Sequence, residues 1–344
     1  MSKKYEIVII GAGVVGTASM YALSRYSDFK EVLLIEKEKD VALLNSNSNN
    51  NSQTLHSGEI ETNYSIEKTK ETKENAKLVV SYANKELNKD EQKNIIQKCQ
   101  KMTLAVGDNE IDKLEKRYDS EFKDIFPYVK KLDKKEAIAK VEPNVVKGRD
   151  KNENLLALFT DNGYMVDYHN LSKSFLDIAL QKDSFKAKFN EEVTEIKKTS
   201  EGYIIKSRKG EILSDSVLVT AGAYSLFFAK KLGYGNNLGV LSVGGKFYYS
   251  KKVLKGKVYR VEREGIPFAA VHGDPDITDP TITRFGPTVN IYPELEKGNL
   301  YSMPDYFHSL NFNEATAKIR ISAQSIHTCS SNNTCSYYYY FILF

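Results

Sequence analysis

The most constraining feature of this sequence is a glycine pattern near its N-terminus. Gly11, Gly13 and Gly16 form a GxGxxG motif directly after the short apolar run Tyr5–Ile10. Such a run is typical of a strand that is buried on both faces of a parallel sheet. The first glycine permits a tight turn, the second lets the backbone approach a pyrophosphate, and the third lets a helix pack closely on the strand. The motif therefore predicts a βαβ unit that binds a dinucleotide.

An acidic residue at the end of the next apolar run supports this prediction. The run Glu31–Glu36 ends at Glu36, which follows Gly16 at the distance that places an acid beside the ribose. We expect Glu36 to bond the ribose hydroxyls and to disfavour NADP, because a carboxylate repels a 2′-phosphate. The motif alone does not choose between NAD and FAD. The structural alternative is a glycine-rich turn that binds nothing.

A later segment favours FAD. Ser214–Tyr224 reads as a strand followed by the small-residue turn Ala221–Gly222, which lets backbone pass close to a cofactor. It resembles the stretch of two-dinucleotide-fold flavoproteins in which a late strand returns to the nucleotide. In such proteins a strand like the one that contains Val193 contacts adenine. The alternative for Ala221 and Gly222 is an ordinary turn between a strand and a helix.

Composition excludes several classes of protein. Of the 344 residues, 41% are hydrophobic and 27% are charged, which is typical of a globular protein rather than a disordered chain. The formal net charge of +4 suits an anionic ligand and gives no support to nucleic-acid binding. The cysteines form no CxxC pair and no metal-ligand spacing, so neither a disulfide scaffold nor a metal site is predicted. No signal peptide or long apolar run is visible, and we expect a cytoplasmic protein.

The most distinctive segment runs from Asn51 to Tyr64 and reads NSQTLHSGEIETNY. It resembles the flavin-contacting segment of FAD-dependent 2-hydroxyacid oxidoreductases. The similarity is greatest to malate:quinone oxidoreductases of the epsilonproteobacterial type, and it extends more distantly to L-2-hydroxyglutarate oxidases. The resemblance covers about residues 5–297 and includes several further stretches: Gln100–Gly107, Lys140–Lys147, Leu232–Val240, Lys255–Val261, Pro267–Asp276 and Thr283–Thr288.

The resemblance implies a cofactor and partners. The cofactor is FAD, the substrate is malate or a similar 2-hydroxydicarboxylate, and the electron acceptor is a quinone. It also implies that four polar residues of the distinctive segment contact the flavin or the substrate, namely Ser52, Gln53, Thr54 and His56. The alternative for this segment is a solvated loop.

Oxidation of a 2-hydroxyacid requires a base for the hydroxyl proton and a cation for the carboxylates. His272 is the leading candidate for the base, because an imidazole titrates near neutral pH. We expect it at the end of a strand, exposed in a loop, with Asp274 orienting its ring. Arg284 is the candidate carboxylate clamp, because a guanidinium binds a carboxylate bidentately. The alternatives are a partly buried histidine in a turn and a surface arginine.

The predicted fold class is α/β, with a Rossmann-like FAD-binding domain and a discontinuous substrate domain of mixed sheet and helices. We expect the FAD-binding domain at 1–80 and 160–232, and the substrate domain at 81–159 and 233–304. Tyr168–Leu180 is predicted as an amphipathic helix and Asp112–Val141 as largely helical, with a break at Pro127. Phe268–His272 is predicted as a strand.

Two features qualify the functional prediction. Members of the family continue well beyond the position that matches Glu296, whereas residues 305–344 form an atypical tail, so we expect a truncated copy. The alternatives are therefore an oxidase of another 2-hydroxyacid or amino acid, and an inactive remnant that binds nucleotide. The lysine runs Lys130–Lys135 and Lys251–Lys257 are read as solvated faces. In a quinone reductase they could instead rest on anionic lipid at the inner face of the cytoplasmic membrane.

Overall fold

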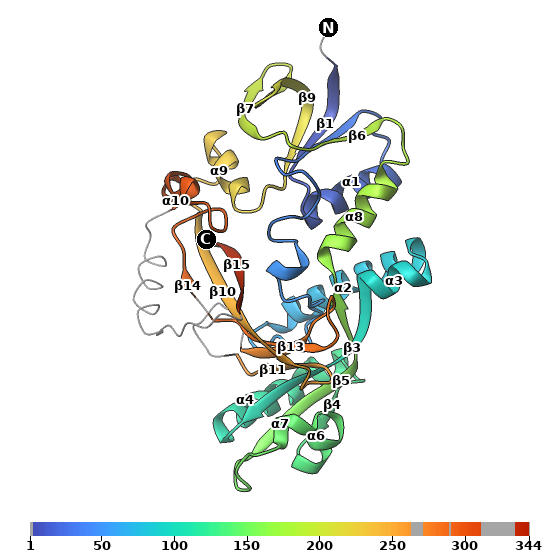
Figure 1. The fold of residues 1–344 in the computed structure, drawn as a ribbon, viewed down its shortest axis with the longest axis vertical. Coiled ribbons are helices and arrows are strands. Elements are labelled where there is room, and N and C mark those ends of the chain that lie inside the picture. Colours follow the sequence, from blue (N-terminus) through green and yellow to red (C-terminus); the bar gives the residue numbers. More distant parts are fainter. Residues whose placement is uncertain (1–2, 263–270, 289, 311–333, 344) are drawn as a thin grey trace.

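The computed structural model describes residues 3–262, 271–288 and 290–310, together with the backbone of residues 334–343. Two β-sheets dominate it, and helices cover them (Figure 1). The first sheet lies at the N-terminal end of the molecule, and helices α4, α6 and α7 lie at the opposite end (Figure 1). This mixture of sheets and helices confirms the predicted α/β fold class.

The first sheet is built around the βαβ unit. Its strands β6, β2, β1 and β9 are parallel, and β8 and β7 extend it as antiparallel neighbours. The six strands, in the order in which they lie in the sheet, are β6 (Phe185–Lys188), β2 (Val32–Ile35), β1 (Lys4–Ile10), β9 (Gly210–Val219), β8 (Gly202–Ser207) and β7 (Val193–Thr199).

Apolar residues on both faces of β1 and β2 explain why these strands form the centre of the sheet. Ile9 and Leu34 pack on one face, against helices α1 (Val14–Tyr26) and α8 (Tyr168–Ala179). Val8 and Leu33 pack on the other face, where α9 (Tyr224–Lys231) contributes Phe228. All four strand residues are fully buried. The predicted helix at Tyr168–Leu180 is confirmed as α8.

The second sheet combines strands from distant parts of the chain. Strand β11 runs parallel to β3, whereas β5, β10, β12 and β13 take part in antiparallel pairs. Its strands are β14 (Asn290–Ile291), β10 (Gly239–Lys251), β13 (Ile282–Gly286), β12 (His272–Pro275), β11 (Lys257–Arg260), β3 (Ile96–Val106), β5 (Leu155–Val166) and β4 (Lys130–Leu132), with β15 (Thr334–Leu343) paired to β10.

The remaining helices connect and cover the two sheets. They are α2 (Ile66–Glu86), α3 (Lys89–Ile95), α4 (Asp108–Arg117), α5 (Lys123–Ile125), α6 (Lys135–Val141), α7 (Pro143–Val146) and α10 (Met303–Ser309), with short turns η1 (Ser48–Asn50), η2 (Tyr118–Phe122) and η3 (Leu300–Ser302). Within the described residues, none of these helices is long and apolar enough to cross a membrane.

Two predicted elements differ from the structure. The stretch predicted as largely helical contains strand β4, whose three residues pair with Phe159, Leu158 and Ala157 of β5. A strand of three residues is too short to show the alternation of apolar and polar residues that marks a strand in a sequence. Its pairing with a distant segment decides its conformation. The predicted strand at Phe268–His272 falls mainly outside the described residues, and in the structure β12 begins at His272.

The division into two discontinuous domains stays a prediction. Strand β5 spans the expected boundary near residue 160 and lies wholly in the second sheet. Of the atypical tail, residues 305–309 belong to α10, and the backbone of 334–343 forms β15 alongside β10 (Figure 1). The residues between 310 and 334 lie outside the described part of the chain.

Candidate functional site

A cavity of about 720 Å³ opens at the carboxyl ends of the central strands of the first sheet. Ile10, Ile35 and Val219, the last residues of β1, β2 and β9, all line it. Ligands of open parallel sheets bind at this edge. Most of the predicted cofactor-binding residues of the nucleotide unit also lie in the wall: Gly11, Gly13, Glu36, Val193, Ala221 and Gly222.

The three glycines of the motif have different surroundings. Gly11 has a φ of +105°, and a Cβ atom there would lie 2.6 Å from the Thr220 carbonyl oxygen. A Cβ on Gly16 would lie 1.9 Å from the carbonyl oxygen of Gly11, so only glycine permits helix α1 to pack this closely on β1. Gly13 is less crowded, because a Cβ there would meet only the Ser46 hydroxyl, at 3.3 Å. At Gly11 and Gly16 the neighbouring backbone therefore leaves no room for a side chain.

The N-terminus of α1 faces the same cavity. Val14 and Val15 line it, and the N-cap residue, Gly13, has no side chain that could bond the first N–H groups of the helix. The backbone N–H of Val14 donates to the Ser46 hydroxyl over 3.0 Å. A helix N-terminus favours an anion through its N–H groups and its dipole. Sequence reasoning missed Ser46, because every residue of the surrounding Asn/Ser run can form hydrogen bonds and the run itself selects none of them.

Glu36 is fixed by backbone donors. Its carboxylate accepts hydrogen bonds from the N–H groups of Ala12, at 2.7 Å, and Glu38, at 2.9 Å. The acid thus ties the end of β2 to the glycine turn while it lines the cavity. Sequence reasoning also missed an ion pair between Lys37 and Glu296, both of which lie in the same wall. No local pattern indicates this pair, since its partners are far apart in the chain.

The three predicted catalytic residues lie together in the second sheet. Asp274 on β12 is the register partner of Arg284 on β13, and His272 begins β12. All three are buried, and the side chain of His272 is only 1% exposed. The expected exposed position of His272 in a loop is therefore wrong. Strands β11 and β13 flank β12, and the Tyr259 ring stacks on the imidazole with 4.3 Å between ring centres.

Opposite charges surround Asp274. Its carboxylate lies 3.1 Å from Nε2 of His272 and 3.2 Å from Nζ of Lys257. Burial alone would raise the pKa of Asp274, but the Lys257 ammonium and His272 hold that pKa below its usual range. Burial in turn lowers the pKa of Lys257, against the opposing effect of Asp274. Asp274 is therefore an ionised carboxylate inside the protein.

Arg284 contacts groups of the protein itself. Its Nε lies 3.3 Å from the Asp276 carboxylate, and its guanidinium donates to the carbonyl oxygens of Ser52, at 3.1 Å, and Asn51, at 3.3 Å. It is fully buried, so the alternative of a surface arginine is excluded. These contacts bring the predicted clamp together with the predicted flavin-contacting segment.

Ser52, Gln53 and Thr54 are buried. The Gln53 amide donates to the Ser48 carbonyl, at 3.0 Å, and its oxygen accepts from the Ile277 N–H, at 2.9 Å. The Thr54 hydroxyl lies 2.7 Å from that of Tyr259. The alternative of a solvated loop is therefore excluded for these residues. Turn η1 connects them to the nucleotide cavity, which it reaches through Asn50.

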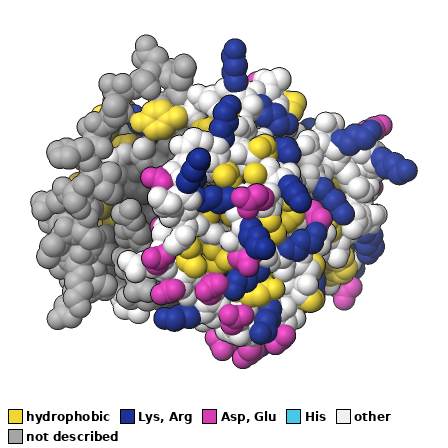
Figure 2. Space-filling view, turned by 90° about the horizontal axis from the view of Figure 1, so that it is seen from below, with side chains coloured by type: hydrophobic (Ala, Val, Ile, Leu, Met, Phe, Trp, Pro, Cys, Tyr) yellow, Lys and Arg dark blue, Asp and Glu magenta, His cyan; other side chains and the backbone are white. Residues whose placement is uncertain are grey.

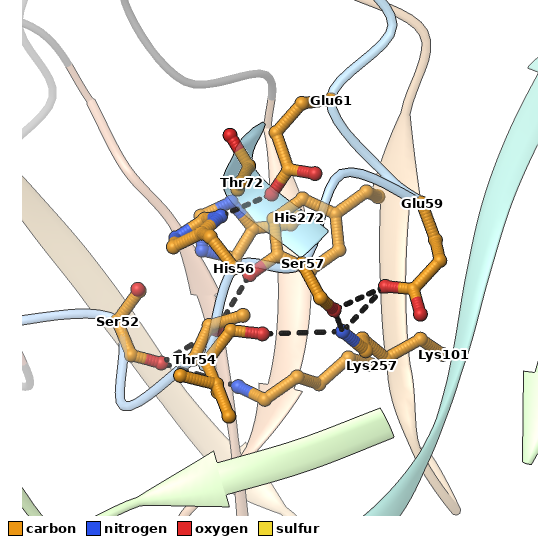
Figure 3. Close-up of polar contacts among 12 residues, drawn as sticks. Ser52, Thr54, His56, Ser57, Glu59, Glu61, Thr72, Lys101, Lys257 and His272 are labelled. Carbon is orange, nitrogen blue, oxygen red and sulfur yellow. Dashed lines mark hydrogen bonds and ion pairs between the residues drawn. The ribbon is translucent and has the colours of Figure 1, made fainter. Parts of the chain in front are cut away.

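His56 has a different environment from its neighbours. Its side chain is 43% exposed, and its Nδ1 bonds Glu61, whose side chain is buried (Figure 3). Burial would raise the pKa of Glu61, but His56 and Lys101 hold that pKa below its usual value. An ionised Glu61 orients the imidazole and selects the tautomer that carries a proton on Nδ1. Sequence reasoning singled out His56 but missed Glu61.

The two lysine runs have mixed surroundings. Lys131 pairs with Glu115 over 2.7 Å, and Lys251 and Lys252 are exposed. Lys257 is fully buried, so the reading of Lys251–Lys257 as a solvated face is wrong for its last residue. The face at the lower end of the molecule carries Lys and Arg side chains interspersed with Asp and Glu (Figure 2). In the described part of the chain, no three His, Cys, Asp or Glu side chains are grouped as metal ligands.

Comparison with solved structures shows where this fold occurs. Glycine oxidase from Geobacillus kaustophilus superposes with a TM-score of 0.68 at 17% identity, covering 98% of this chain and 83% of that enzyme. The FAD-bound L-α-glycerophosphate oxidase of Mycoplasma pneumoniae superposes with a TM-score of 0.65 at 21% identity, covering 90% of this chain and 80% of that enzyme. At these identities the likeness concerns the fold alone.

Sequence comparison identifies the family. The family model described as malate:quinone oxidoreductase (Mqo) matches residues 3–330. A probable malate:quinone oxidoreductase of Campylobacter jejuni is 41% identical over 329 residues, which are 92% of this chain and 72% of that protein. The malate:quinone oxidoreductase of Helicobacter pylori is 41% identical over 311 residues, which are 88% of this chain and 67% of that protein. The chain therefore belongs to the malate:quinone oxidoreductase family, as the resemblance of its Asn51–Tyr64 segment implies.

Proposed function

We propose that this protein oxidises malate to oxaloacetate with FAD and passes the electrons to a quinone. The match of residues 3–330 to the malate:quinone oxidoreductase family carries this proposal. The arrangement of the site supports it, because the chain that follows Asn50, a residue of the cavity wall, accepts hydrogen bonds from Arg284 of a buried cluster that also holds a histidine and a carboxylate. Those are the groups that oxidation of a 2-hydroxydicarboxylate requires.

The volume and the lining of the cavity support a site for the nucleotide half of FAD. Its volume of about 720 Å³ is within the range of cofactor sites. We propose that the N–H groups at the start of α1 and the Ser46 hydroxyl bind the diphosphate, and that Glu36 binds the ribose. Val193 is proposed to contact adenine, while Ala221 and Gly222 let backbone approach the cofactor. When it is bound, FAD supplies the redox chemistry by accepting a hydride equivalent from the substrate.

The buried cluster supplies the protein's own part of the chemistry. We propose that His272 accepts the proton of the malate hydroxyl and that Asp274, whose carboxylate lies 3.1 Å from its Nε2, stabilises the resulting imidazolium. Arg284 is the proposed clamp for a malate carboxylate. Its contacts with Asp276 and with the Ser52 carbonyl would hold the guanidinium in a fixed orientation. Burial of all three groups excludes water and strengthens each electrostatic interaction.

We also propose that the protein meets its quinone at the inner surface of the cytoplasmic membrane. An acceptor that is soluble in lipid requires contact with that surface. Exposed apolar side chains on η3 and α10 support this proposal: Leu300 is 69% exposed, Tyr301 94% and Phe307 54%. Burial of such side chains in a lipid headgroup region is favourable.

The test follows the absorbance of oxidised flavin in the purified protein after reconstitution with FAD. Anaerobic addition of malate is expected to bleach the flavin bands, and a soluble quinone analogue is expected to restore them. Bleaching by 2-hydroxyglutarate or an amino acid, but not by malate, would assign the protein to another oxidation. A folded protein that takes up no flavin would contradict the whole proposal.

A further inference from the structure

Two lysines lie side by side beneath the Asn51–Ser57 segment. Lys101 on β3 and Lys257 on β11 are register partners in the parallel pair, and both side chains are 0% exposed. Lysines are rarely buried, because removal of an ammonium from water is costly. Exposed lysines lie close by in the sequence, at Lys98 and Lys255, so full burial is particular to these two positions.

Both ammonium groups donate to the same segment (Figure 3). Nζ of Lys257 lies 3.1 Å from the Ser52 carbonyl oxygen. Nζ of Lys101 lies 3.2 Å from the Leu55 carbonyl oxygen and 2.9 Å from the Ser57 hydroxyl. The two lysines therefore hold the segment at its beginning and at its end.

Each lysine also has a carboxylate partner that balances its charge. Lys257 pairs with Asp274, at 3.2 Å, and Lys101 pairs with Glu59, at 3.1 Å. These two ion pairs are sufficient to balance the charges of the lysines. The additional bonds to Ser52, Leu55 and Ser57 show that the ammonium groups also satisfy polar groups of the segment.

The conformation of the segment explains why it needs such support. Gln53 has a φ of +51°, in the left-handed region that a side chain disfavours. The segment lies outside the named strands, and one isolated bridge, between Thr54 and Met165, is the β-pairing given for its backbone; its other contacts with the second sheet are made by side chains. Hydrogen bonds to charged donors are strong enough to hold a backbone in such a conformation.

We propose that Lys101 and Lys257 are positioning residues that hold the Asn51–Ser57 segment in the conformation that receives the flavin end of FAD. This inference rests on the proposed function, because it takes FAD as the ligand of the neighbouring cavity. The segment continues directly from Asn50, which lines that cavity, so it is the stretch of chain that the part of FAD beyond the diphosphate would meet. Neither lysine touches the cofactor in this role.

The test removes one positioning lysine together with the charge of its partner. In the double variant Lys101→Met and Glu59→Gln, no charged group is left unpaired in this buried site, and the amide oxygen that replaces the Glu59 carboxylate can still accept from Tyr128, as Glu59 does. The variant is expected to melt cooperatively. We expect its Kd for FAD to rise about tenfold or more, the effect of losing a hydrogen bond from a charged donor. The matched control is Lys98→Met on the same strand, which should leave the Kd unchanged.

Amide hydrogen exchange of the cofactor-free protein gives an independent measurement. Peptides that cover residues 51–57 are expected to exchange faster in the double variant than in the wild type, with the rest of the second sheet unaffected. A wild-type Kd together with wild-type exchange in the double variant would overturn the inference. If the wild type itself takes up no FAD, the proposed function fails, and the exchange measurement still decides the positioning role.

A milder variant covers the case in which the double variant does not fold. Ser57→Ala removes one acceptor of Lys101 without altering any buried charge. It is expected to speed the exchange of residues 51–57 and to weaken FAD binding by a smaller factor than the double variant. Unchanged exchange in Ser57→Ala would count against the proposal.

Discussion

The Nε2 atom of His272 lies 3.1 Å from the carboxylate of Asp274, and neither side chain is more than 1% exposed. Lys257 approaches the other oxygen of the same carboxylate, at 3.2 Å. Asp274 thus links His272, the proposed base, to Lys257, whose ammonium also donates to the Ser52 carbonyl in the segment proposed to contact the flavin. Its negative charge stabilises the Lys257 ammonium and would stabilise the imidazolium that His272 forms on accepting a proton, so its loss should affect catalysis more than the loss of a surface carboxylate would.

Replacement of Asp274 by asparagine is expected to slow reduction of the bound flavin by malate by about 10²- to 10⁴-fold, the usual range for general acid–base catalysis. Asparagine cannot stabilise the imidazolium of His272. The rate constant is measured by anaerobic stopped-flow spectroscopy on protein with matched flavin content. Asp279→Asn, at an exposed position, is the control and should leave the rate unchanged. A D274N enzyme that reduces its flavin at the wild-type rate would remove Asp274 from the proposed mechanism.

The Glu61–His56 pair predicts a dependence of stability on pH. Burial would raise the Glu61 pKa, but His56 and Lys101 lower it below the ordinary value, which is about 4.3 in an unfolded chain. The contribution of Glu61 is therefore present above about pH 4.3 and is lost as the pH falls through the lowered folded pKa. Over this acid range the free energy of unfolding should fall less in Glu61→Gln than in the wild type, as measured by urea denaturation. Glu201→Gln, at an exposed position, should follow the wild-type curve.

Replacement of Glu36 by glutamine is expected to weaken the binding of FAD. Its carboxylate accepts from the N–H groups of Ala12 and Glu38, and a glutamine offers one acceptor oxygen instead of two. Because the carboxylate is also the proposed acceptor for the ribose hydroxyls, Glu36→Gln is expected to raise the Kd for FAD by about tenfold, the cost of one bond to a charged acceptor. Fluorescence quenching of FAD measures this change. A Kd equal to that of the wild type would show that the acid only supports the turn.

The nucleotide unit could be predicted from the sequence because its signals are local. The strand, the glycines and Glu36 lie within the first 36 residues, and the close backbone contacts that require glycine at positions 11 and 16 are made with Thr220, directly after β9, and with Gly11 itself. The amphipathic pattern of α8 is local in the same way. Such features depend little on the rest of the chain.

The environment of the buried cluster could not be predicted from the sequence. His272 is buried because β11 and β13 flank it, and these pairings join segments that are separated by loops. Lys257 ends a run of lysines that looks solvated, and only its pairing with Lys101 on the distant strand β3 places it inside the protein. Ser46 and Glu61 acquire their roles from tertiary contacts with Val14 and His56. Pairing between distant strands leaves no periodic signal in a single sequence.

Alanine substitutions of Gly16 and Gly13 are expected to have different effects on thermal stability and on FAD binding. A Cβ on Gly16 would lie 1.9 Å from the Gly11 carbonyl oxygen, so Gly16→Ala must separate α1 from β1 and should destabilise the protein by about 1–3 kcal/mol. A Cβ on Gly13 would meet only the Ser46 hydroxyl, at 3.3 Å, so Gly13→Ala should melt like the wild type. Because Gly13 lines the cavity, its new methyl group should nevertheless weaken FAD binding. Thermal melting and FAD titration of both variants check the pair. Equal melting temperatures for G16A and G13A would contradict the close packing of α1 on β1.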